Sequence, residues 1–181
     1  MKKRTRGILA GIALAALTAG CVLVSGQFLV QVELGDLIVD SATAVQGLYV
    51  DLPSKGTYRD HKNDIKTLED VALLGSVHNT GTSSVTVSVY LIDGNSGPLP
   101  LATIISPSGG KQVWGPLTVA AGATEVLAWD RSATLFGSGK SVLLDEIKNG
   151  GQFTLYVVSS TTPFEFEIKD AVFVAVIGAA K

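Results

Sequence analysis

The chain has 181 residues, of which 46% are hydrophobic and 17% are charged, and its formal net charge at pH 7 is −2. This length is typical of one domain, and the charge balance excludes a strongly basic protein of the kind that binds nucleic-acid phosphates. A single cysteine excludes a framework of intramolecular disulfides.

The N-terminal segment has the order of a secretory signal peptide. Residues 1–6 hold four basic side chains and no acid, and residues 7–20 are an unbroken run of apolar and small residues that ends at Cys21. This run is shorter than the roughly 17 to 25 apolar residues that a membrane-spanning helix needs. We therefore expect residues 1–20 to be cleaved off, which leaves an acidic mature chain with 10 basic and 16 acidic residues.

The residues just before the cysteine resemble the lipobox of bacterial lipoproteins. They read Leu17-Thr18-Ala19-Gly20-Cys21, with Thr18 at the place where that family usually has Leu. The resemblance implies that a diacylglyceryl group is attached to Cys21 before the chain is cut on its N-terminal side. The mature protein is then expected to be lipid-anchored in the cell envelope, with its domain outside the cytoplasm. Val22 follows the cysteine, which by the same resemblance favours the outer membrane if the host has two membranes.

A second interpretation of this segment stays open. Arg6-Gly7 ahead of an apolar run is also similar to the cleavage site of type IV pilin-like proteins. Bacterial pilins carry a Glu near the fifth position of the mature helix, and residues 8–12 contain none, whereas archaeal relatives lack that Glu. This alternative predicts a subunit of an extracellular filament, either pilin-like or assembled by strand addition at a sheet edge.

After the anchor, the periodicity changes to the alternation that is typical of half-buried strands. We expect residues 21–27 to form a lipidated N-terminus with a short tether, and residues 28–181 to form one domain. The first strands are predicted over 28–34, 37–39 and 47–52, each bounded by turn-forming residues.

Residues 53–66 are the most polar stretch and predict a surface loop, with one helical turn over 63–70. Within it, Asp60, Asn63 and Asp64 carry the hard oxygen ligands that suit Ca²⁺. Their spacing does not match an EF-hand loop, and neighbouring basic side chains would repel a cation. We therefore predict a solvated loop and no metal, with these three residues as the only weak candidates.

The middle of the chain predicts paired strands. Runs over 71–77 and 85–92 flank a polar turn, which indicates an antiparallel hairpin. A segment rich in Gly, Ser and Pro follows, and its short apolar piece at 101–105 is predicted to be an edge strand. Residues 117–119 and 123–129 then predict a strand, a turn and a second strand.

The last third adds one helix and two strands. Ser141 is a good N-cap, and the apolar spacing after it predicts one short helix over 141–149. Strands are predicted over 152–159 and 164–177. With about eight or nine strands in all, the sequence predicts an all-β fold, namely an antiparallel immunoglobulin-like β-sandwich with one short inserted helix.

Two pieces resemble prokaryotic immunoglobulin-like modules of cell surfaces, a group that includes the CARDB and LEA type 2 domains. Val77-His78-Asn79-Thr80-Gly81, leading into the strand at 85–91, looks like the "valine, any, asparagine, any, glycine" hairpin of that group. Residues 117–123, leading to 126–129, are similar to its paired strand and glycine turn. The helix at 141–149 departs from the simplest such modules.

The residue types that carry catalysis are scarce in this sequence. His61 and His78 are the two histidines, and an acylated Cys21 leaves no cysteine for a nucleophile or a zinc site. The sequence contains no Gly-x-Ser-x-Gly elbow and no phosphate-binding glycine loop. We predict that the protein is not an enzyme and needs no cofactor.

The tryptophans and tyrosines could form an aromatic face of the kind that carbohydrate-binding modules use. Four of the six lie in strand-like runs, where packing is the commoner fate. The exceptions are Tyr58, in the polar loop, and Trp114, which we predict to be exposed and the best ligand contact. We therefore expect a non-enzymatic envelope module whose partners are the membrane and an envelope protein or glycan, but no nucleic acid.

Overall fold

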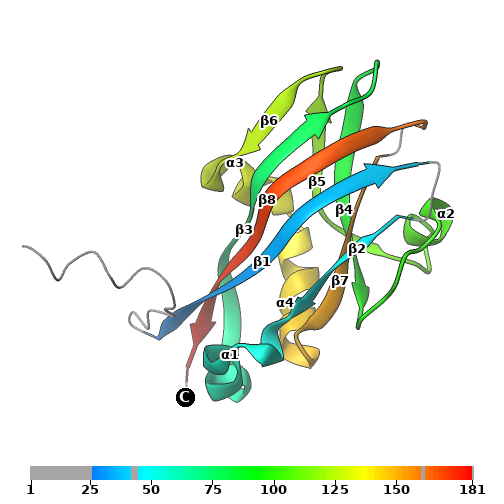
Figure 1. Cartoon of the computed structure of the whole chain (residues 1–181). Coiled ribbons are helices and arrows are strands. Elements are labelled where there is room, and N and C mark those ends of the chain that lie inside the picture. Colours follow the sequence, from blue (N-terminus) through cyan, green and yellow to red (C-terminus); the bar gives the residue numbers. More distant parts are fainter. Residues whose placement is uncertain (1–25, 42–44, 160–161, 181) are drawn as a thin grey trace, which may run out of the picture.

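The computed structural model describes residues 26–41, 45–159 and 162–180, and Cys21 lies outside them. These residues form a sandwich of two four-stranded antiparallel sheets (Figure 1). One sheet, the β1 sheet, contains in spatial order β1 (Gln27–Asp40), β8 (Glu165–Ala179), β3 (Ile65–Asn79) and β6 (Thr124–Leu127). The other, the β2 sheet, contains β2 (Gly47–Asp51), β7 (Gln152–Ser159), β4 (Val85–Asp93) and β5 (Lys111–Val119). The predicted all-β antiparallel sandwich is confirmed.

The core lies between the two sheets. Along β4, Val85, Val87 and Val89 are buried and the residues between them are half-exposed, which is the alternation expected of a strand with one buried face. Phe153 on β7 and Phe173 on β8 meet edge to face, with ring centroids 6.0 Å apart. Such contacts between the layers bury apolar surface from both sheets, and this burial is the main stabilising contribution.

Four α-helices accompany the strands in the described residues. They are α1 (Gly56–His61), α2 (Leu101–Ile104), α3 (Trp129–Phe136) and α4 (Gly139–Asn149), and 3₁₀ turns cover Leu52–Ser54 and Lys62–Asp64. The predicted helix at 141–149 corresponds to α4. The predicted helical turn at 63–70 is wrong, because the helical residues come earlier and β3 already begins at Ile65.

The predicted edge strand at 101–105 is also wrong, since these residues contain α2. The amides of Thr103 and Ile104 both donate to the carbonyl of Pro100, which closes a helical turn. Ile104 is fully buried, and the hydroxyls of Thr154 and Tyr156 on β7 donate to carbonyls of the segment just before this turn, which places the segment over the outer face of the β2 sheet. Residues 101–105 therefore cover the outer face of the β2 sheet and do not add a strand to its edge.

The predicted hairpin over 71–92 is an arch between the sheets. β3 pairs with β8 and β6, whereas β4 pairs with β5 and β7, so the turn between β3 and β4 crosses from one sheet to the other. The turn between β5 and β6 crosses in the same way. Alternation shows that a strand has one buried face, but it does not show which strand lies beside it, and the hairpin prediction failed for this reason.

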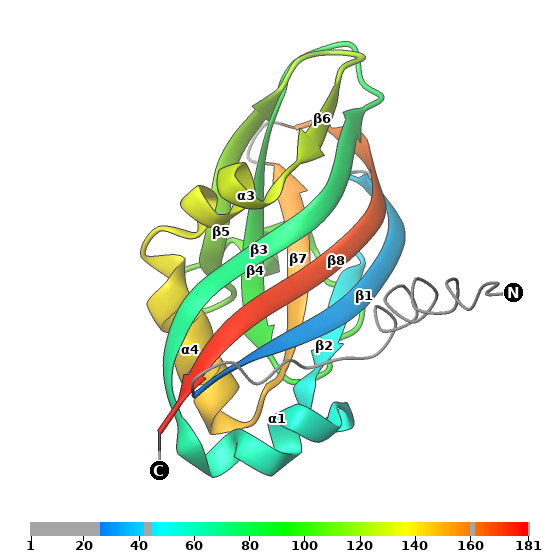
Figure 2. The same cartoon turned by 90° about the vertical axis from the view of Figure 1, so that its left-hand side faces the viewer.

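Helices α3 and α4 close one side of the sandwich, next to β3 and β5 (Figure 2). β6 is short and pairs only with Gly75–His78, so the edge of β3 continues beyond it. There the Ser132 hydroxyl of α3 accepts a hydrogen bond of 2.8 Å from the amide of Leu73. The side chain of Ser132 on α3 therefore pairs with a backbone amide at the edge of β3, where β6 no longer does so.

Asp70 on β3 forms hydrogen bonds to both of these helices. Its Oδ2 accepts a hydrogen bond of 2.8 Å from Nε1 of Trp129, the first residue of α3. Its Oδ1 accepts bonds from Nζ of Lys140, on α4, and from the amide of Val71. Burial by itself raises the pKa of Asp70, but the hydrogen bonds from Lys140, Trp129 and Val71 outweigh it and lower this pKa below its ordinary value.

We expect Asp70→Asn to lower the free energy of unfolding by about 1 kcal/mol at pH 7, a small figure because solvent screens this half-exposed site. Since the pKa of Asp70 is lowered by folding, its contribution is present above the unfolded-state value of about 3.9 and is lost as the pH falls through the folded value. Urea unfolding at pH 7 and pH 3 measures this. The difference between wild type and variant should shrink at pH 3, and Asp130→Asn, on the exposed side of α3, should show no such difference.

Candidate functional site

Trp114 is not on the surface, so the prediction of an exposed ligand contact is wrong. Its side chain is 2% exposed, and Nε1 donates to both the carbonyl and the hydroxyl of Ser132 at 3.1 Å. The cause is a bulge: Val87 pairs with Leu117 and Val89 with Trp114, so β5 has one residue more than β4 over this stretch. The bulge changes which side chains point inward, and this change is not visible in the sequence alternation.

Tyr58 is also buried, although the segment around it was predicted to be a solvated surface loop. Its ring is 0% exposed, and its hydroxyl donates a hydrogen bond of 2.6 Å to the carbonyl of Ile147, near the end of α4. Burial and the negative charge of Glu146 raise the pKa of Tyr58. The polar loop is therefore a packed segment that joins α1 to α4, and its aromatic ring is not available to a ligand.

The weak metal candidates lie on this same segment. Asp60 is an exposed residue of α1, and Asn63 and Asp64 are in the 3₁₀ turn that follows it. Over the parts of the chain that the structure describes, no three His, Cys, Asp or Glu side chains are placed to hold a metal ion.

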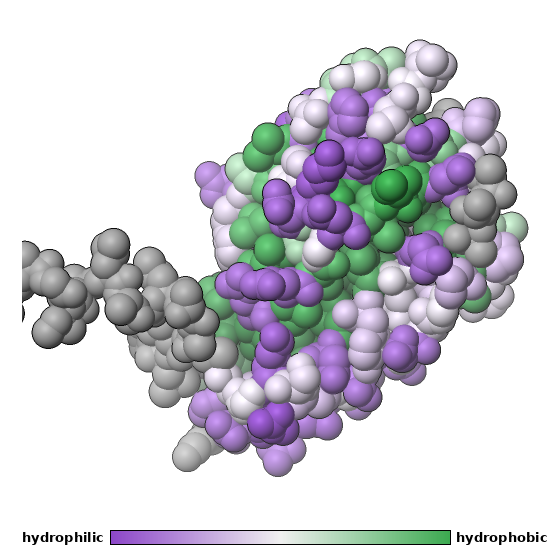
Figure 3. All heavy atoms as spheres, in the orientation of Figure 1, coloured by the Kyte–Doolittle hydropathy of each residue, from purple (hydrophilic) through white to green (hydrophobic). Residues whose placement is uncertain are grey.

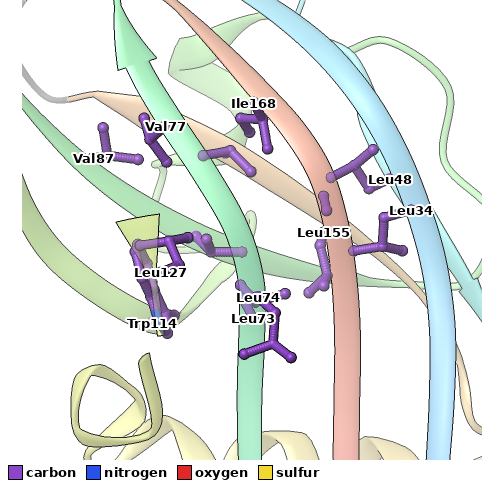
Figure 4. A pocket seen from close by; sticks show the side chains of 13 residues that line it. Leu34, Leu48, Leu73, Leu74, Val77, Val87, Trp114, Leu127, Leu155 and Ile168 are labelled. Atoms are coloured by element: carbon purple, nitrogen blue, oxygen red, sulfur yellow. The ribbon is translucent and has the colours of Figure 1, made fainter. Parts of the chain in front are cut away.

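A small apolar cavity lies between the two sheets (Figure 4). Its volume is about 30 Å³, and residues from all eight strands line it, including Leu34, Leu48, Trp114 and Leu127. Pockets that hold small-molecule ligands measure about 300–1,000 Å³. The cavity is therefore a packing defect of the core and too small to enclose such a ligand.

The side of the sandwich opposite α3 and α4 is formed by the edges of β1 and β2. Within residues 26–180 as described, β1 pairs only with β8 and β2 only with β7. Leu34, Leu37 and Leu48 lie half-buried along this side and pack against the core. Figure 3 shows apolar atoms between polar ones on the face that Figure 1 turns to the viewer.

The outer face of the β1 sheet carries a second group of apolar side chains, which we call the apolar strip. Register and alternation place its members in three adjacent rows on β1, β8 and β3. They are Leu29, Ala72, Val172, Val174 and Val176, all of them buried or half-buried, and the same rows also hold Gln31, Glu33 and Asp70. Figure 2 turns this face to the viewer, and no described helix or loop lies in front of β8.

A line of bulges ends the apolar strip. Gly35 on β1 and Gly75 on β3 have φ values of +75° and +129°, and Asp170 on β8 has φ +53°. A Cβ on Gly75 would lie 2.6 Å from the carbonyl oxygen of Lys169, so a side chain at this position is excluded. The three strands therefore lose regular pairing at the same level, which divides the β1 sheet into two halves.

Beyond the bulges, the same outer face is charged. An open hollow of about 420 Å³ there is lined by Asp36, Glu167 and Lys169 together with Leu37, Ile38 and Ile168. Lys169 pairs with Glu167 at 3.0 Å, and this bond and the nearby charges of Asp36 and Asp170 raise the pKa of Lys169. These charges neutralise one another at the surface and form no convergent catalytic group.

Neither a protein-family model nor a curated protein matches the chain. No helix among the described residues is long and apolar enough to cross a membrane. The sequence analysis missed the apolar strip, although a signal was present: residues 171–177 are apolar at every position. Such a run is typical of a strand that is covered on both faces.

Proposed function

We propose that the protein is a non-enzymatic envelope module, held close to a membrane by an acylated Cys21 and used for binding or envelope structure. The position of the two chain ends supports this best. Gln27 pairs with Gly178, and the amide of Ala179 donates a hydrogen bond of 2.6 Å to the carbonyl of Gly26. An anchor attached ahead of Gly26 therefore holds one end of the sandwich and leaves the arches at the other end free.

The use of the polar side chains supports a non-enzymatic role. The buried Asn79, Ser132 and Thr154 all make hydrogen bonds to backbone groups, so each has a structural task. Asp70 fastens two helices, and the charges around Lys169 are paired at an open surface. In the described chain these groups do not converge on a pocket that could hold a substrate.

Intact-mass measurement of the membrane fraction tests the anchor. For the unchanged chain we expect a mature protein that begins at Cys21 and carries a diacylglyceryl mass, and for Cys21→Ser we expect neither. Thr18→Leu is the matched variant, because it restores the usual lipobox residue and should raise the processed fraction. A chain that begins at Gly7 or Ile8 without lipid would contradict the proposal.

A filament subunit is the second candidate, and the edge of β1 favours it. This strand has 14 residues and pairs on one side only within the described residues. An open strand edge is the surface to which another chain adds a strand. The same mass measurement separates the candidates, since a pilin-like subunit keeps residues 8–20 and gains no lipid.

A further inference from the structure

We propose that the open edge of β1 beyond its bulges, at residues 36–40, binds a short basic strand of another protein by strand addition. The bound strand has a basic, an apolar and a basic side chain at alternate positions. This inference rests on the binding role proposed above, and it adds the site and the chemical class of the partner.

The four edge strands differ in how much of their edge is open to a further strand. β2 has five residues and β6 has four, and β5 packs against α3 and α4. β1 has 14 residues and, within the described chain, pairs with β8 alone (Figure 1). Its start lies beside α1, where the ring centroids of Phe28 and His61 are 5.2 Å apart. We therefore place the added strand on the later half of β1.

Residues 37–40 give this half a regular edge. They pair with residues 165–168 of β8 without a register shift, whereas the irregular pairing around Gly35 comes just before them. A regular edge strand has backbone groups on its outer side that a further strand can pair with. β2 pairs with β7 over five residues, so pairing of this length already holds a strand in this fold.

The outer face of this edge combines an exposed apolar side chain with acids. Ile38 is 67% exposed and lines the hollow of about 420 Å³ together with Asp36, Glu167 and Lys169. By alternation, Asp36 and Asp40 lie on the same face of β1 as Ile38. An added strand brings its own outward side chains to about 4.5–5.5 Å from these three. The matching strand is therefore apolar beside Ile38 and basic two residues to either side.

The charge of β1 favours a basic partner over a second copy of this chain. The strand holds Glu33, Asp36 and Asp40 and no basic residue. Lys169 on β8 pairs with Glu167, and neither Glu33 nor Asp36 forms an ion pair among the described residues. When β1 of a second copy lies alongside, acids meet acids, which is destabilising. Charges of this kind prevent self-association at an edge and leave it open to a strand of opposite charge.

The inner side of the edge indicates apolar residues at the positions in between. Leu34, Leu37 and Leu48 lie half-buried along this side of the sandwich. The inward side chains of an added strand lie on the same side and remove more of this apolar surface from water, which stabilises the bound state.

An NMR titration of the isotope-labelled, lipidated full chain in zwitterionic micelles tests the site. The probe is the peptide acetyl-Lys-Val-Val-Val-Lys-amide. We expect saturable shifts of the backbone amides of residues 37–40, and weaker binding at high salt. Two matched peptides should bind severalfold more weakly. They are Lys-Lys-Val-Val-Val, which has the same composition without the alternation, and Glu-Val-Val-Val-Glu, which has the opposite charge.

Two pairs of variants identify the residues. Ile38→Lys should weaken binding about tenfold, because a like charge replaces an apolar contact. Val126→Lys is its matched control, since Val126 is also 67% exposed but lies on β6, at the other edge of the same sheet. Asp36→Asn keeps the acceptor for the Asp170 amide and should weaken binding about two- to fivefold, whereas Asp130→Asn on α3 should not change it. Circular dichroism confirms that each variant is folded.

Methylation of the peptide amides tests strand addition itself. Alternate amides of an added strand face its neighbour, and the amides between them face away. We therefore expect that methylation of either the central valine or the two valines beside it abolishes binding, and that the other change leaves binding intact. Equal effects of the two changes would show attraction without strand pairing and would overturn the inference.

Three further outcomes overturn the inference, and its failure is distinguishable from failure of the anchor. A chain whose mass shows the lipid but whose amides show no saturable shift keeps the anchor and rejects the site. Equal binding of Lys-Lys-Val-Val-Val shows that charge alone attracts the peptide. Shifts at residues 37–40 that grow with protein concentration in the absence of peptide show that a second copy occupies the edge. A chain without lipid that binds the peptide as expected supports the site and rejects the anchor alone.

Discussion

Asn79→Ala is expected to lower the free energy of unfolding by about 3 kcal/mol, because it removes several hydrogen bonds at a fully buried site. Asn79 is 0% exposed, and its side-chain amide donates to the carbonyls of Val119 and Ala120 at 3.0 and 3.1 Å. The same amide donates to the carbonyl of Ser83, and Oδ1 accepts a bond from the amide of Gly81. One side chain thus joins the β3–β4 arch to the β5–β6 arch.

Urea unfolding of two further variants separates this role from general sensitivity of the arch. Asn79→Asp keeps the acceptor for Gly81 but places a carboxylate oxygen against carbonyl oxygens, so its loss of stability should be at least as large at pH 7 and smaller at low pH. Thr80→Ala, at an exposed neighbouring position, should change the stability by less than about 0.5 kcal/mol. A loss that small for Asn79→Ala would show that the arches hold together without it.

Trp114→Ala is expected to cost about 3–5 kcal/mol, the range for removing a large buried aromatic side chain. The indole fills the space beside the apolar cavity and donates to Ser132, whose hydroxyl also accepts from the amide of Leu73. Its loss therefore enlarges an existing void of about 30 Å³ and weakens the contact between β5 and α3.

Trp114→Phe is the matched variant, since it keeps most of the ring volume and removes the donor; we expect a loss of about 1–2 kcal/mol. In a double-mutant cycle with Ser132→Ala, the two losses should be less than additive because the residues share a bond. The enlarged cavity of Trp114→Ala is apolar and should bind benzene, which a rise in melting temperature detects. A fully additive cycle would argue against the coupling between Trp114 and Ser132.

Local pattern predicted most of the strands, because alternation and turn formers are local properties. The prediction at 152–159 matches β7, and the one at 85–92 matches β4 to within one residue. The helix at 141–149 was predicted from its apolar spacing and agrees with α4 to within two residues at its start. These segments have a periodicity that the tertiary structure preserves.

The wrong predictions share a physical cause: at these residues, contacts between distant parts of the chain determine the structure, and local sequence pattern does not. α2 is helical because its apolar side chain covers a sheet, and Trp114 is buried because a bulge at Gly115 turns it inward. The motif around Asn79 was found in the sequence, but its side chain joins two arches that lie far apart in the sequence. The alternation within one strand carries no information about a hydrogen-bond partner forty residues away.

The way in which β1 enters the sandwich has a mechanical consequence. This strand starts at the end where we propose the anchor, and it runs along β8 through twelve paired positions. If a partner pulls on the far arches while the anchor holds Gly26, the force acts along the strand axis and loads all of these pairs together in shear. A force applied at Ala179 and Gly26 in opposite directions would instead open them one at a time. An attachment at the N-terminal end, as proposed, would therefore let the domain bear tension along its strands.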